Sequence, residues 1–181
     1  VRSRSQRVRF GPVSESDLAA WLVRKGIENP REVARLSEGC PGRALEMDLE
    51  GVKDWRHARD AFIDAVHLDA NGRFRYAESM CKGDRTKWLG TVHNTMDAVS
   101  CLLRDALALT DQGSVVYNDD RLEVVRDWSD RLGPDGVSRL AMAVSNARTR
   151  LDGYVSGRLV MDAFVAEVVT ELERGGQLAS I

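Results

Sequence analysis

Apolar residues recur at helical spacing along most of the chain, and the length of the apolar segments changes near residue 50. Before that position each segment consists of a residue that can cap a helix, one or two apolar turns, and a glycine. Ser14 is such a cap, with Asp17 as its partner, and Asn29 precedes Pro30 in the same way. The pattern predicts three short helices, within residues 11–26, 29–39 and 41–51. Connections of only a few residues would join them into a compact three-helix unit.

Longer amphipathic segments follow residue 53. In the first of them, Trp55, Ala58, Phe62 and Val66 share one stripe of a helix. The longest segment runs from Asp84 to Gly113. Its apolar side chains keep steps of three or four residues: Trp88, Val92, Met96, Val99, Leu103 and Leu107. This spacing predicts one long helix with a continuous buried face.

The helical pattern continues to residue 176. A shorter segment covers residues 71–83, Asp119 and Asp120 are placed to cap the next helix, and Gly133–Pro134 separates that helix from its successor. No sustained alternation of apolar and polar residues occurs outside the first ten residues. The fold class that we expect is therefore all-α. Its parts would be the three-helix unit over 13–50, a boundary near 48–54, a bundle of five or six helices over 54–175 and a flexible tail over 176–181.

Composition narrows the class of protein. With 181 residues and a formal net charge of -2, the chain has no overall basicity that would indicate a nucleic-acid binder. Its three cysteines are far apart, which favours buried or incidental thiols in a reducing compartment over a disulfide framework or a zinc site. No apolar run reaches the roughly 18 residues that span a membrane, and there is no signal-peptide core. We therefore expect a cytoplasmic protein with no membrane partner.

Side chains that could perform chemistry are scattered along the chain. His57, His67 and His93 each fall within a predicted helix, at spacings that do not suit a metal ion. The carboxylates follow helix surfaces and first turns, and the GxxxxGK[ST] phosphate loop does not occur in the sequence. We expect no metal site, and no catalytic turnover by this chain alone.

The first ten residues, VRSRSQRVRF, differ from the helical pattern. Val8 and Phe10 alternate with Arg7 and Arg9, so the two kinds of side chain would point to opposite sides of an extended segment. Such a segment is typical of a strand end that leaves a sheet.

The second unusual stretch is GCPGRAL, residues 39–45. Pro41 and Gly42 begin a predicted helix, and Arg43 falls in its first turn. A cation there opposes the helix dipole, at a cost of a few tenths of a kcal/mol to about 1 kcal/mol. Proteins tolerate this mismatch where an anion binds; the alternative is an arginine that lies solvated over its own helix.

Taken together, the two stretches resemble a junction found in bacterial clamp-loader subunits, which are AAA+ proteins. In that family a Ser-Arg-Cys tripeptide ends the ATPase domain, and an extended segment and a Pro-led helix lead into a helical lid. Ser3, Arg4 and Gln6 match the pattern as they stand, whereas Ser5 replaces the cysteine. The resemblance implies that residues 1–12 are an extended remnant of the ATPase domain.

The stretch SEGCPGRAL, residues 37–45, resembles the sensor-2 helix of the lid. Its Pro-Gly form is closer to the delta-prime subunits of the DNA polymerase III clamp loader than to the ATP-hydrolysing gamma/tau subunits. Residues 54–175 are similar in length and layout to the collar domain, through which clamp-loader subunits assemble. The resemblance therefore implies a lid over residues 13–50 and an oligomerisation domain after it.

Site residues follow from the same resemblance. Arg4, supported by Ser3 and Ser5, would act as an arginine finger toward ATP on a neighbouring subunit. Arg43, with Pro41 and Gly42, would lie on the phosphate side of the subunit's own nucleotide site. No cofactor is expected in this chain, because ATP would be bound by neighbouring subunits.

The implied function is that of a stator and scaffold in the pentameric clamp loader. Its direct partners would be the gamma/tau and delta subunits, and the sliding clamp and primer-template DNA would be indirect partners. Two alternatives remain at this stage: a piece of a gamma/tau-type ATPase, and a stand-alone helical nucleic-acid-binding module. The second would use the arginines of the arm, Arg2, Arg4, Arg7 and Arg9, although the rest of the sequence offers no basic face to extend them.

Overall fold

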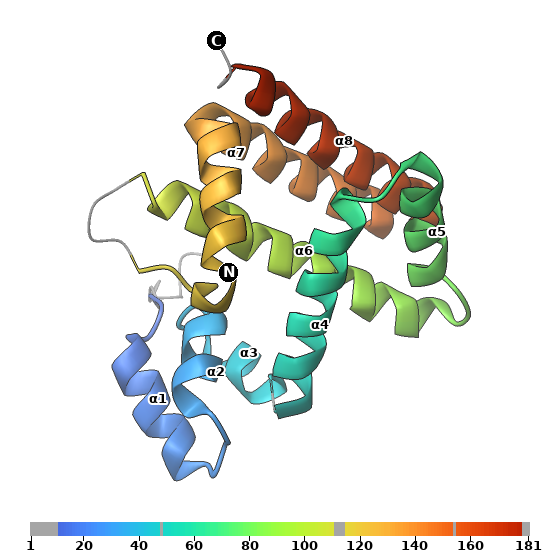
Figure 1. The fold of residues 1–181 in the computed structure, drawn as a ribbon. Coiled ribbons are helices and arrows are strands. Elements are labelled where there is room, and N and C mark those ends of the chain that lie inside the picture. Colours follow the sequence, from blue (N-terminus) through green and yellow to red (C-terminus); the bar gives the residue numbers. More distant parts are fainter. Residues whose placement is uncertain (1–10, 48, 111–114, 154, 179–181) are drawn as a thin grey trace, which may run out of the picture. The chain divides into compact units, whose positions relative to one another are not determined.

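The structure is a computed structural model that describes residues 11–47, 49–110, 115–153 and 155–178. Every regular element among these residues is a helix, so the all-α prediction is confirmed. The chain divides into two compact units, Val1–Lys53 and Asp54–Ile181. Figure 1 shows the helices in chain order.

Three short helices form the described part of the first unit: α1 (Glu15–Arg24), α2 (Pro30–Leu36) and α3 (Pro41–Glu46). The predicted capping pair at the start of α1 is confirmed, because the Asp17 amide donates to Ser14 Oγ at 3.1 Å. In return, the Ser14 hydroxyl donates to the Asp17 carboxylate at 2.6 Å. Leu18 and Leu22 of α1 are buried, and α1 packs on α2.

Asn29 is the N-cap residue of α2, as predicted, and its backbone carbonyl accepts from the Val33 amide at 3.1 Å. Asn29 does precede Pro30 at the start of α2, but its side chain makes no capping hydrogen bond. Its backbone is left-handed, with φ of 52°, a conformation that asparagine tolerates better than most residues. Asn29 therefore caps α2 through its backbone, in a left-handed conformation and without a side-chain hydrogen bond.

Five longer helices belong mainly to the second unit: α4 (Leu49–Val66), α5 (Ala70–Met80), α6 (Arg85–Ala108), α7 (Leu122–Asp152) and α8 (Gly157–Leu178). A short 3₁₀ turn, η2 (Asp119–Arg121), precedes α7. Helix α7 packs on α6 and α8, and α8 also packs on α5 (Figure 1). Their apolar faces meet in one core whose largest members include Phe62, Met96, Trp128, Leu140 and Phe164.

The predicted apolar stripes are largely correct. The stripe of α4 is buried from Trp55 to Val66, and the stripe of α6 is buried from Val92 to Leu103. Leu107 is an exception, because 43% of it is exposed near the end of α6. A residue near a helix end can keep the spacing of the stripe and still lie beyond the last neighbouring helix.

Helix α7 bends sharply in its middle, and its second arm runs beside α8 (Figure 1). Gly133 has φ of 55° and ψ of −178°, which interrupts the helical backbone immediately before Pro134. The sequence predicts two helices separated at this point, and the structure shows two helical arms that continue directly into one another. The bend lets one sequence segment contact both α6 and α8.

Helix α8 crosses α7 at very short range near its end. A Cβ atom at Gly175 would overlap the backbone carbonyl of Arg131, whereas one at Gly176 would find its nearest neighbour at 3.7 Å. The helix extends to Leu178, so both glycines lie within it, and the prediction that a flexible tail begins at Gly176 is wrong. Gly175 thus permits a backbone contact that any side chain would prevent.

We predict that Gly175→Ala lowers the free energy of unfolding by about 1–3 kcal/mol, because the added methyl group must push the two helices apart. Gly176→Ala is the matched control, and we expect it to be neutral or stabilising by up to about 1 kcal/mol, since alanine is the better helix former. Urea unfolding followed by circular dichroism measures both values. Equal effects of the two substitutions would show that no close helix crossing exists at Gly175.

Candidate functional site

A cluster of ion pairs surrounds Arg59 of α4, a buried residue of which only 1% is exposed. Its guanidinium donates two hydrogen bonds to the Asp120 carboxylate, at 2.8 and 2.6 Å. It donates two more to Asp60 and Asn118, at 2.8 and 3.0 Å. Arg121 completes the cluster with a second forked pair to Asp60, at 3.0 and 2.6 Å. The cluster connects α4 to the η2 turn, sixty residues away in sequence.

A second set of hydrogen bonds fixes the residues just before η2. Asp105 of α6 is fully buried, and its Oδ2 atom accepts from the amides of Tyr117 and Asn118 at 2.9 and 2.7 Å. The same oxygen accepts from the side-chain amide of Asn118 at 2.7 Å. Arg104 pairs with the other oxygen at 2.7 Å and stacks over the Tyr117 ring at 3.2 Å. The segment before α7 is therefore attached to both α4 and α6.

The pKa shifts in the cluster show that its groups stabilise one another as ions. The hydrogen bonds from Arg121 and then Arg59 lower the pKa of Asp60 to about 2, although partial burial opposes the shift. The hydrogen bond from Arg59 lowers the pKa of Asp120 in the same way. Burial disfavours the charge of Arg59, but Asp120 and Asp60 outweigh it and raise its pKa. Strongly paired carboxylates of this kind are poor proton acceptors, so the cluster fits a structural role better than acid–base catalysis.

This cluster was not predicted from the sequence, whose pattern instead suggested that Asp119 and Asp120 cap a helix. That assignment is wrong, because they form the η2 turn and Asp120 pairs with Arg59. A signal was present: Arg59 lies four residues after Trp55 and three before Phe62, on the apolar stripe of α4. A charged residue at a core position predicts a buried partner, but the partner cannot be identified from helical spacing.

The residues of the sequence motifs lie in two places. Ser3, Arg4 and Ser5 are outside the described residues. Pro41 is the first residue of α3, and Gly42 and Arg43 follow in the first turn, as the sequence predicts. Arg43 Nη1 lies 3.8 Å from a carboxylate oxygen of Glu38, and 31% of the arginine side chain is exposed. The cation in the first turn therefore has a carboxylate close by within the chain.

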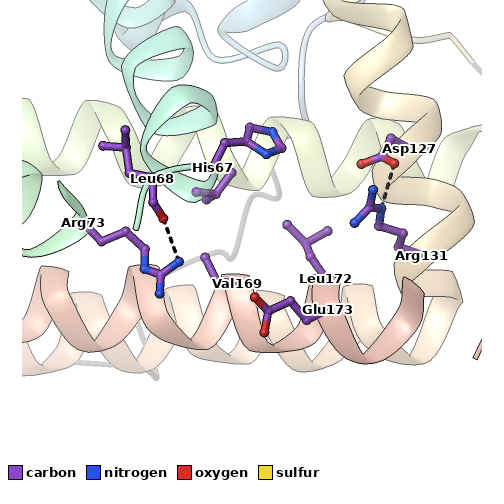
Figure 2. Close-up of a pocket in the computed structure, with 9 residues that line it drawn as sticks. His67, Leu68, Arg73, Asp127, Arg131, Val169, Leu172 and Glu173 are labelled. Carbon is purple, nitrogen blue, oxygen red and sulfur yellow. Dashed lines mark hydrogen bonds and ion pairs between the residues drawn. The ribbon is translucent and has the colours of Figure 1, made fainter. Parts of the chain in front are cut away.

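A cavity of about 260 Å³ lies between the end of α4, α5, α7 and α8, and its lining residues are drawn in Figure 2. Arg73 and Arg131 lie on opposite sides of it, with Glu173 of α8 between them. Arg73 donates to the Leu68 carbonyl at 2.9 Å, and Arg131 donates to Asp127 at 2.7 Å. Both guanidinium groups are thus engaged within the chain, and two carboxylates balance their charge. This arrangement has no net preference for an anion.

Two further cavities each lie within one unit. The first, about 720 Å³, is a wide hollow between α1 and α2, with Ala20 and Val23 on one wall and Arg31 on the other. The second, about 440 Å³, lies between α4, α5 and α6, and its lining mixes apolar side chains with hydroxyl, amide and ionisable ones. Both volumes fall within the range of small-molecule sites, which is roughly 300–1,000 Å³.

The remaining candidates for chemistry are dispersed. His57 lies on α4 and His93 on α6, whereas His67 lies in the turn after α4 and not within a helix as predicted. The described cysteines Cys40, Cys81 and Cys101 form no disulfide bond with one another, and burial raises the pKa of Cys81. Among the described residues, no group of three or more histidine, cysteine and acidic side chains is placed to hold a metal ion. No described helix is both long and apolar enough to cross a membrane.

Compared with models of protein families, with curated proteins and with solved structures, the chain matches none of them.

We predict that Arg59→Met lowers the free energy of unfolding by about 3 kcal/mol. Loss of a buried ion-pair partner costs about 3–5 kcal/mol, and the lower end applies because Asp60 and Asp120 keep some contact with water. Arg126→Met, at an exposed position of α7, is the matched control and should change stability by less than about 0.5 kcal/mol. Chemical denaturation measures both variants; equal stabilities would contradict the structural role of the cluster.

Acid should weaken the cluster in a defined range. Because the pKa of Asp60 is lowered from 3.8 to about 2 in the folded chain, its stabilising contribution is complete above pH 4 and is lost as the pH falls through 2. We expect the unfolding free energy of Asp60→Asn to be lower than that of the unmodified chain by roughly 1 kcal/mol at pH 6, a value reduced for partial exposure. The difference should shrink toward pH 2. Urea titrations at several pH values test this, and a difference that does not change with pH would be evidence against the shift.

Proposed function

We propose that this chain is the lid and collar of a clamp-loader subunit of the delta-prime type, and that it acts as a scaffold in the assembled clamp loader. The observation that carries the proposal is the stretch at residues 37–45. Helix α3 starts at Pro41 and places Arg43 in its first turn, which is the arrangement expected for a sensor-2-like helix. The match of Ser3, Arg4 and Gln6 to the family junction adds to it from the sequence side.

The architecture is compatible with this role. The described part of the first unit consists of three short helices, the layout expected for a lid. The second unit consists of longer helices around one core, the layout expected for a collar. Met142 and Leu159 in that unit are large apolar residues with 67% and 57% of their surfaces exposed. Exposed apolar side chains of this kind are available for contacts with other subunits.

The proposed chemistry belongs to the assembly and not to the chain alone. Arg4 would stabilise the charge that develops on the γ-phosphate of ATP bound to a neighbouring subunit. Arg43 would contribute to a nucleotide site only together with an ATPase domain. The chain itself would act by assembling the gamma/tau and delta subunits, and the complex would load the sliding clamp on primer-template DNA in the cytoplasm.

Co-expression with the gamma/tau and delta subunits tests the assembly role. We expect the chain to co-elute with them in size-exclusion chromatography and to give no heat with ATP in calorimetry when it is alone. A chain that stays apart from these subunits but binds duplex DNA, with an affinity that falls steeply with salt, would instead be the nucleic-acid-binding module. Micromolar affinity of the isolated chain for ATP would also contradict the proposal.

The trans-acting arginine has its own test in the reconstituted complex. We expect Arg4→Ala to lower ATP hydrolysis at the neighbouring site by about 10²-fold or more, since arginine fingers contribute about 10³–10⁵ to turnover. Arg2→Ala, on the same basic segment, is the matched control and should have little effect. Equal losses from both substitutions would indicate a general electrostatic effect of the segment and would contradict a specific finger.

A further inference from the structure

We draw no further inference here: the strongest candidate, the outer faces of α7 and α8 that expose the apolar side chains of Met142 and Leu159, carries nothing, because nothing in the structure shows what covers them.

Discussion

The ion cluster around Arg59 is the interaction on which the second unit most depends. Arg59 is buried, so its charge is tolerable only because Asp60, Asp120 and Asn118 satisfy its donors. Two of these partners follow α6 and precede α7, so the cluster determines where the chain lies between the two helices. Apolar packing alone does not specify the path of such a connection, because it has no directional preference. The hydrogen bonds that the Asp105 carboxylate accepts from amides of the same segment provide that direction.

The position at which α7 begins has consequences along the rest of the chain. The first arm of α7 starts directly after η2, and the break at Gly133 redirects the second arm alongside α8. Gly175 then allows α8 to approach the backbone of α7 at Arg131. The ion cluster at Arg59, the backbone break at Gly133 and the missing side chain at Gly175 thus direct successive parts of the chain. The apolar core that they enclose contributes most of the buried surface, whereas these three features select one arrangement of it.

Polar groups in this molecule fall into two classes with different meanings. In the Arg59 cluster each charge has partners within the chain, and the depressed pKa of Asp60 reflects that pairing. Among the described residues, Asp54 and Asn94 on the wall of the cavity between α4, α5 and α6 have no such partners. The first arrangement stabilises a fold, whereas Asp54 and Asn94 remain at least partly open to water. Arg43 is intermediate, since it is partly exposed with Glu38 as a nearby carboxylate.

The sequence by itself determined the helices and the apolar stripe that each long helix carries. It also determined the cap at Ser14, the start of α3 at Pro41 and the break at Gly133. These features depend on residues within a few positions of each other, which helical spacing makes visible. It did not determine the partner of Arg59, the exposure of Leu107 or the close approach at Gly175. Nor did it show the cavity, which three helices form together. Only the tertiary structure decided these, because each depends on a neighbour that is distant in the chain and that local periodicity cannot identify.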